Sequence, residues 1–181
     1  MTLMMRNWSK TIPFFLPFVL VGCTKVKDMF MGPLNPPGYE AVASDIKVKR
    51  VMLVSSPKAN DGDPIVVHMV VAYNLQVAQM LLRLNASEYF DTLKTLKKDF
   101  HGMFDVIAWQ VQPGKPIPQT KNIKQIASLN LDKAVGGYFF ARYSHPKGSH
   151  RLKIPEYVQI RVHLDEKGMQ LIDPENPDQE T

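Results

Sequence analysis

The strongest constraint on the fold is the spacing of apolar residues after residue 45, which is strand-like in most of the chain and helix-like in one region. Runs with strand character cover residues 46–55, 65–73, 104–112, 134–143 and 158–172, and another strand starts near Arg151. A parallel sheet would need a helix between successive strands. Six to eight strands with one helical insertion therefore predict an all-β domain, an antiparallel two-sheet β-sandwich.

Four of these segments give more detail. The apolar alternation changes phase near Arg50, which predicts a β-bulge in the first strand. Residues 65–73 are almost continuously apolar, as in a central strand that is buried on both faces. Residues 158–172 read as a hairpin, and Gly136 and Gly137 indicate a close backbone approach or a bulge in their strand. Residues 115–132 are harder to place, and we assign them one irregular strand.

The helical region begins at a recognisable cap. Asn85 and Glu88 have the spacing of a capping box, and the apolar residues that follow recur at helical intervals, which predicts an amphipathic helix over residues 86–100. Residues 77–84 have the same spacing and predict a shorter helical turn before it. We expect this apolar stripe to pack against the sheet; the alternative is a face that binds lipid or a partner.

Length and charge bound the organisation of the chain. Its 181 residues allow one ordinary domain with a leader and a tail, which we assign to residues 45–172, 1–22 and 173–181. The acidic tail contains two prolines and is expected to be disordered. The net charge is +5, and without Arg6 and Lys10 of the leader it is 20 − 17 = +3. A mildly basic body can meet an acidic partner or anionic headgroups, or can simply be a solvated surface.

The first 22 residues have the pattern of a secretory leader. The positive residues Arg6 and Lys10 precede an apolar stretch over residues 12–21 and then the small Gly22. A membrane-spanning helix needs roughly 20 apolar residues, so this stretch is too short for a permanent span. Signal cleavage is therefore predicted between Gly22 and Cys23.

The residues around this cleavage point resemble the bacterial lipobox, with Leu20, Val21 and Gly22 before Cys23. The resemblance implies covalent diacylglycerol on the thiol and an N-acyl chain on the new amino terminus. Two or more acyl chains hold a protein durably on a membrane. Thr24 directly follows the cysteine. In the sorting rule for Gram-negative lipoproteins, a residue other than Asp at this position resembles an outer-membrane address. Residues 23–44 lack a sustained apolar period and predict an extended tether.

The sequence lacks the common motifs for catalysis and metal binding. The sequence has no HExxH, GxSxG or GxxxxGK[ST] motif, and its one cysteine allows no internal disulfide. His145 and His150 flank one turn, and Asp61 and Asp63 share a loop, yet solvated turns explain both pairs better than metal sites. We expect no enzyme activity, catalytic residue, metal or other cofactor, and no nucleic acid or small-molecule substrate.

The order of these features resembles the TssJ family, outer-membrane lipoproteins of the type VI secretion membrane complex. The likeness is carried by the lipobox ending in Cys23, by the segment 60–67 leading to Tyr73-Asn74-Leu75, by Tyr89-Phe90 in the helix, and by the Pro-Gly turn at residues 113–114. The strand over residues 135–143 and the hairpin over residues 158–172 extend it over nearly the whole mature chain. This chain departs from the family in a longer insertion at residues 76–84.

The resemblance implies a transthyretin-like sandwich that tethers the inner-membrane protein TssM to the periplasmic face of the outer membrane. It also implies contact with the periplasmic domain of TssM through the loop after the first strand, which here comprises Lys58, Ala59, Asn60, Asp61, Gly62 and Asp63. The alternatives are a lipoprotein subunit of another envelope machine, such as a conjugation or type IV system, and a periplasmic ligand-binding lipoprotein or enzyme with a site inside the sandwich.

Overall fold

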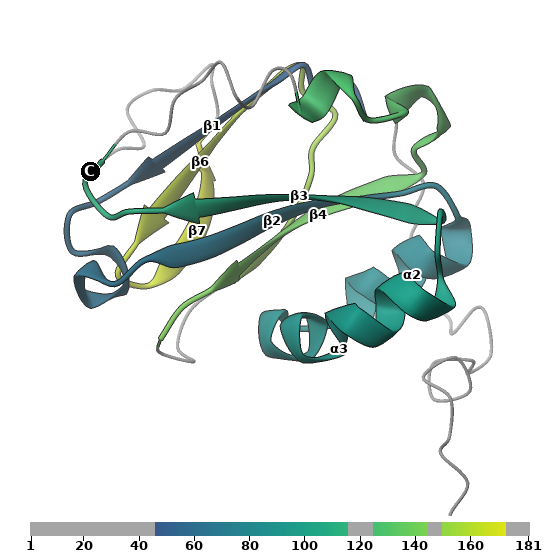
Figure 1. Ribbon diagram of the computed structural model, residues 1–181. Coiled ribbons are helices and arrows are strands. Elements are labelled where there is room, and N and C mark those ends of the chain that lie inside the picture. Colours follow the sequence, from purple (N-terminus) through teal and green to yellow (C-terminus); the bar gives the residue numbers. More distant parts are fainter. Residues whose placement is uncertain (1–45, 116–124, 145–149, 173–181) are drawn as a thin grey trace, which may run out of the picture.

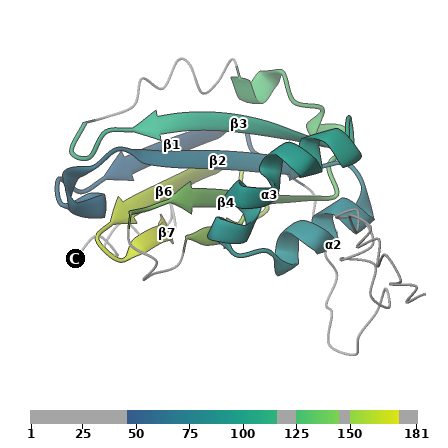
Figure 2. The same ribbon diagram turned by 60° about the horizontal axis from the view of Figure 1, so that its bottom comes forward.

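In the computed structural model, which describes residues 46–115, 125–144 and 150–172, two β-sheets pack face to face and helices cover the outer face of one of them (Figures 1 and 2). The elements in chain order are β1 (Arg50–Ser55), η1 (Ala59–Gly62), β2 (Ile65–Ala72), α2 (Leu75–Arg83), α3 (Ala86–Asp99), β3 (Phe104–Val111), η2 (Leu131–Lys133), β4 (Gly136–Arg142), β5 (Arg151–Lys153), β6 (Gln159–Asp165) and β7 (Gly168–Ile172). The predicted all-β sandwich with a helical insertion is confirmed.

Strand order differs from a purely antiparallel sandwich at one place. One sheet has the order β1-β6-β7 and the other β3-β2-β4-β5. Every pair is antiparallel except β1 and β6, which run parallel from Arg50↔Gln159 to Ser55↔Leu164. The chain crosses from β5 in one sheet to β6 in the other, so that β6 starts at the same end of the sandwich as β1. Sequence periodicity does not report strand direction, and the prediction missed this parallel pair.

The bulge predicted near Arg50 is present at the start of β1. The backbone N–H groups of Lys49 and Arg50 both donate to the carbonyl of Val158, at 2.8 and 3.2 Å. Two residues on one strand thus face one residue on the other, as in a β-bulge. Because of the extra residue, Val48 and Val51 both point into the core.

Two apolar cores lie on opposite faces of β2. Val67, Met69 and Val71 face the core between the two sheets, whereas Val70 and Ala72 face the core beneath the helices. This explains why residues 65–73 are apolar at nearly every position. Gly137 on the neighbouring β4 allows the close approach predicted for it, because a Cβ there would stand 2.6 Å from Ile46 Cδ1.

The helical insertion packs on the four-stranded sheet, as predicted. The capping box at α3 is formed: the Glu88 N–H donates to Asn85 Oδ1 at 3.0 Å, and the Asn85 N–H donates to Glu88 Oε2 at 2.9 Å. Tyr89 of α3 stacks on Phe140 of β4 with ring centroids 4.0 Å apart. Arg151 of β5 donates to the carbonyls of Leu82 and Leu84, which closes the end of α2.

The irregular strand assigned to residues 115–132 is wrong for the part that the structure describes. Residues 125–133 form helical turns that end in η2, and no strand. Ile126 is buried in the core between the sheets, with the partly buried Leu129 and Leu131 packed against it. The apolar residues that suggested a strand therefore lie on helical turns and pack against the core. The predicted hairpin at residues 158–172 is confirmed as β6 and β7.

Candidate functional site

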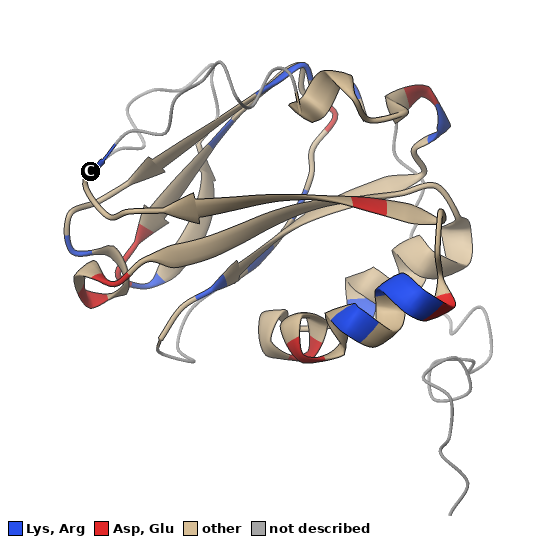
Figure 3. Ribbon diagram, viewed as in Figure 1, with Lys and Arg blue, Asp and Glu red and all other residues tan. Residues whose placement is uncertain are grey.

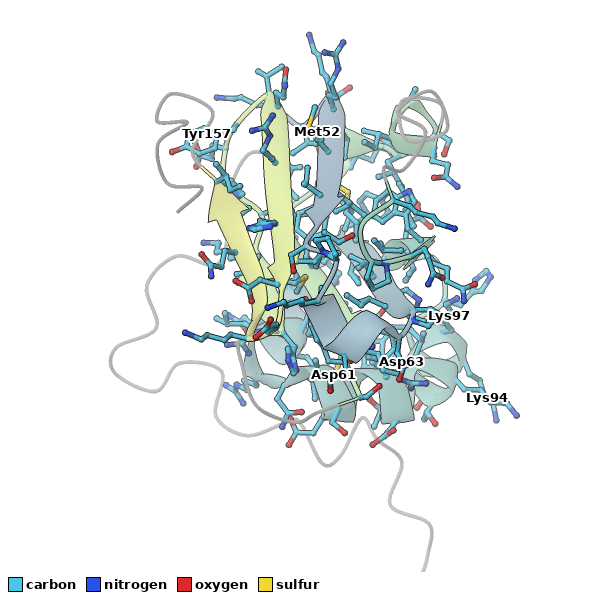
Figure 4. The ribbon with its side chains drawn as sticks, turned by 90° about the vertical axis from the view of Figure 1, so that its left-hand side faces the viewer. Met52, Asp61, Asp63, Lys94, Lys97 and Tyr157 are labelled. Atoms are coloured by element: carbon cyan, nitrogen blue, oxygen red, sulfur yellow. The ribbon has the colours of Figure 1, made fainter. Side chains whose placement is uncertain are left out.

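The loop predicted to contact a partner lies between β1 and β2, at one end of the sandwich, and contains the short helix η1 (Figures 1 and 4). Lys58, Asp61, Gly62 and Asp63 are exposed. Ala59 and Asn60 are buried, with exposed fractions of 0% and 3%. Four of the six predicted residues are thus available to a partner, whereas the other two build the loop.

The backbone of this loop is left-handed at three successive residues. Asn60, Asp61 and Gly62 have φ values of 50°, 55° and 86°. The left-handed region costs most residues roughly 1–2 kcal/mol, and Asn, Asp and Gly tolerate it best. The sequence Asn-Asp-Gly therefore suits this conformation. Residues held in such regions persist where the surrounding structure determines them, and they cluster at ligand clamps and other functional sites.

Asn60 provides the bonds that hold the loop. Its Nδ2 donates to the carbonyls of Asp63 and Pro64 at 3.2 and 3.3 Å, and its Oδ1 accepts from the backbone N–H of Ser144 at 2.5 Å. The Ser144 hydroxyl also lies 3.4 Å from Asp63 Oδ2. Ser144 follows β4, so the amide ties the loop to a segment 84 residues away. Sequence reasoning grouped Asn60 with the contact residues and missed this role, although Asn before Asp-Gly is a known signal of left-handed backbone.

A pocket of about 370 Å³ lies beside the loop, and Ser144 belongs to its lining. Its walls include the first two turns of α3 and the end of β4. Arg142 lies over the Phe90 ring, 4.6 Å from its centroid, and Asp91 is on the same rim. His150 stacks on Tyr143 at 4.5 Å. Ser144, which bonds to Asn60, therefore links the loop to this pocket.

No metal centre is assembled in the described part of the chain, where no three His, Cys, Asp or Glu side chains gather in a position to hold an ion. His145, the suggested companion of His150, lies outside the described residues. His68 is partly buried: its ring packs on Phe90, and its Nδ1 lies 3.1 Å from the Tyr89 hydroxyl. Burial, with Lys97 and Arg142 nearby, lowers the pKa of His68 to about 4, so its ring is neutral at neutral pH.

The proposed anchor lies outside the described residues. Gly22 and Cys23, the tether over residues 23–44 and the tail over residues 173–181 remain predictions from the sequence. Within residues 46–115, 125–144 and 150–172, no helix combines the length and apolar character that a bilayer crossing needs.

Compared with known proteins by sequence, the chain matches no family model and no curated protein. Compared by structure, it matches the lipoprotein TssJ1 of the type VI secretion system of Pseudomonas aeruginosa with a TM-score of 0.50. That match has 13% identity and covers 67% of this chain and 92% of TssJ1. A chain from a type VI membrane complex matches with a TM-score of 0.51 at 12% identity, over 71% of this chain and 99% of that one. This chain has a TssJ-like fold. At such identities the TssJ likeness establishes the fold alone.

Proposed function

We propose that this protein is a lipid-anchored subunit of a type VI secretion membrane complex, which tethers a TssM-like inner-membrane protein to the periplasmic face of the outer membrane. The observation that carries the proposal is the structural match of this sandwich to TssJ1, which covers 92% of that chain. The lipobox-like segment ending in Cys23 supports the anchor, and Thr24 supports the outer-membrane address. The proposed role is mechanical and requires no catalytic group.

In this proposal the loop over residues 58–63 docks on the periplasmic domain of the TssM-like partner. The exposed Lys58, Asp61 and Asp63 offer charge, and Gly62 allows close approach of the partner to the backbone. The bonds from Asn60 fix the loop before binding, which lowers the entropy lost on association. A polar loop also presents a specific surface without an apolar patch that would promote aggregation.

Charge reversal in the loop tests the docking. The protein is purified with its partners from solubilised envelopes, and recovery of the large inner-membrane protein is measured by mass spectrometry. We expect the double variant Asp61→Lys/Asp63→Lys to lower that recovery by at least about tenfold, the equivalent of roughly 1.4 kcal/mol.

A matched control carries the same change of charge elsewhere. Asp99 and Asp132 are exposed and lie at the end of the sandwich away from the loop. Asp99→Lys/Asp132→Lys should leave recovery unchanged. Undiminished recovery with the loop variant would remove the loop from the proposal, and recovery of a conjugation or type IV component would replace the type VI assignment.

A further inference from the structure

The two ends of the sandwich differ in the kind of side chain that they expose. In the described part of the chain, the large apolar side chains that are most exposed are Leu75 (48%), Met103 (41%), Tyr157 (47%) and Val158 (52%). Leu75 and Met103 flank the end of β2 and the start of β3, and Tyr157 and Val158 precede β6. All of them lie at the end where β1 begins, opposite the loop over residues 58–63. In Figure 4, Tyr157 lies near the top of the view, well apart from Asp61 and Asp63.

The end that carries these apolar side chains is also where the upstream chain joins the domain. Ile46, the first described residue, packs against Gly137 near the start of β4. Lys49 and Arg50 then bond to the Val158 carbonyl, so this entry segment lies directly beside the exposed Tyr157 and Val158. The 45 residues before Ile46 include Cys23, the proposed site of lipid attachment. The tether therefore leaves from this end of the sandwich.

The charges beside the point where the chain enters the domain are mainly positive. Lys47, Lys49 and Arg50 are exposed where the chain enters, and Glu156 is the one carboxylate in residues 46–50 and 154–159 (Figure 3). Tyrosine rings and the long stems of lysine and arginine are the side chains that suit the headgroup region of a bilayer. Basic residues are attracted to anionic phospholipid within about a Debye length of the surface.

We propose that the chain-entry end of the sandwich, comprising Lys47, Lys49, Arg50, Tyr157 and Val158, rests on anionic phospholipid and turns the loop over residues 58–63 away from the membrane. The contact extends the proposed function, because it assumes that the chain is anchored upstream of Ile46. The anchor keeps this surface at a high effective concentration near the bilayer, so that even a weak contact sets the orientation.

Photo-crosslinking in vesicles tests this orientation. The full chain is expressed in bacteria and purified from membranes with the crosslinker benzoylphenylalanine in place of Tyr157 or, in a second protein, of Asp61. Each protein is reconstituted into vesicles of phosphatidylethanolamine and phosphatidylglycerol at a ratio of about 3:1, which supplies the anionic surface. Lipid adducts are counted by mass spectrometry. We expect adducts at position 157 to exceed those at position 61 by at least about fivefold.

Charge variants separate headgroup attraction from simple proximity. Lys47→Glu/Lys49→Glu should lower the yield at position 157 by about tenfold, since each basic residue contributes separately to the attraction. Lys94→Glu/Lys97→Glu makes the same change of charge on α3 and should leave the yield within about twofold of the unmodified protein. Figure 4 shows Lys94 and Lys97 apart from Tyr157. Thermal melting verifies that every variant is folded.

Three outcomes would overturn the proposal. The first is an equal yield of lipid adducts at positions 157 and 61. The second is an equal effect of the two double variants on the yield at position 157. The third is a crosslink, in intact cells, from position 157 to a protein in place of lipid. A free thiol at Cys23 would instead refute the anchor in the proposed function. In that case the protein is coupled through the thiol to a maleimide phospholipid, which supplies an anchor. Its orientation is then measured from the adduct yields at positions 157 and 61 in the same vesicles.

Discussion

Asn60 is the residue on which the conformation of the candidate loop depends. Its backbone is left-handed, and both its Nδ2 and its Oδ1 make hydrogen bonds to backbone groups. One of these partners, Ser144, comes from a distant part of the chain. Apart from tyrosines and Trp109, it is the one buried polar side chain in the described residues. A buried polar group adds specificity when all of its bonds are made and is costly when they are not.

Replacing Asn60 separates these effects. Asn60→Ala removes the three bonds and leaves a side chain that tolerates positive φ poorly, so we expect the free energy of unfolding to fall by about 2–4 kcal/mol. Asn60→Gly removes the same bonds without backbone strain and should cost about 1 kcal/mol less than Asn60→Ala. Urea denaturation measures both variants. An equal loss of unfolding free energy in the two variants would show that backbone strain at this position does not affect stability.

His68 makes stability depend on pH. Its pKa is about 4 in the folded protein and 6.5 in an unfolded chain, so the unfolded state binds more protons between these values. The contribution of His68 to the free energy of unfolding is therefore fully present above pH 6.5 and is lost as the pH drops from 6.5 toward 4. We expect His68→Gln to flatten this part of the profile, measured by urea denaturation at a series of pH values. If the dependence of stability on pH is the same in His68→Gln as in the unmodified protein, His68 is not its cause. His163→Gln, on the other sheet, is the control.

At the scale of elements, local caps and distant packing both position the helical insertion. Asn74 and Asn85 cap α2 and α3 through side-chain bonds to backbone N–H groups, which satisfies donors that a helix start leaves open. Arg151 reaches the last carbonyls of α2 from β5, and Tyr89 stacks on β4. The insertion is therefore part of the core, and its apolar stripe is not a face for lipid or a partner.

The cap of α3 gives a prediction with a built-in control. Asn85→Ala breaks the capping box and should destabilise the protein by about 1 kcal/mol, measured by urea denaturation. Asn130 occupies the equivalent position before η2 but makes no side-chain cap bond. Asn130→Ala is expected to change stability by less than about 0.5 kcal/mol. Equal losses in the two variants would contradict a role for the capping box.

At the scale of the whole molecule, the two ends of the sandwich are proposed to face different partners. The loop over residues 58–63 follows the end of β1, whereas the segment at Ile46 precedes its start (Figure 1). In the proposed function a pull between the two membranes therefore passes through the domain, from the docking loop to the lipid tether. A sandwich with two apolar cores is a stiff connector for such a role.

The anchor itself is tested in cells. We expect Cys23→Ser to abolish acylation, because only the thiol can form the thioether, and to release the protein from washed membranes. Thr24→Asp should keep the fatty acids, detected by mass, but move the protein from the outer to the inner membrane. Acylated Cys23→Ser protein in membrane fractions would end the lipoprotein assignment.

The fold class, most strands, both helices of the insertion and the capping box could be predicted from the sequence alone. These features follow from local periodicity and from contacts between residues a few positions apart, such as Asn85 with Glu88. Glycine at position 137 likewise marked the close approach that the structure contains.

Three features could not be predicted from the sequence. They are the parallel pairing of β1 with β6, the helical turns over residues 125–133 in place of a strand, and the division of the loop into exposed and buried residues. Each depends on segments that are far apart in the chain: Arg50 meets Gln159, Ile126 fills the space between two sheets, and Asn60 finds Ser144. Apolar spacing reports which face of a segment is buried. It carries no information about which distant segment buries it.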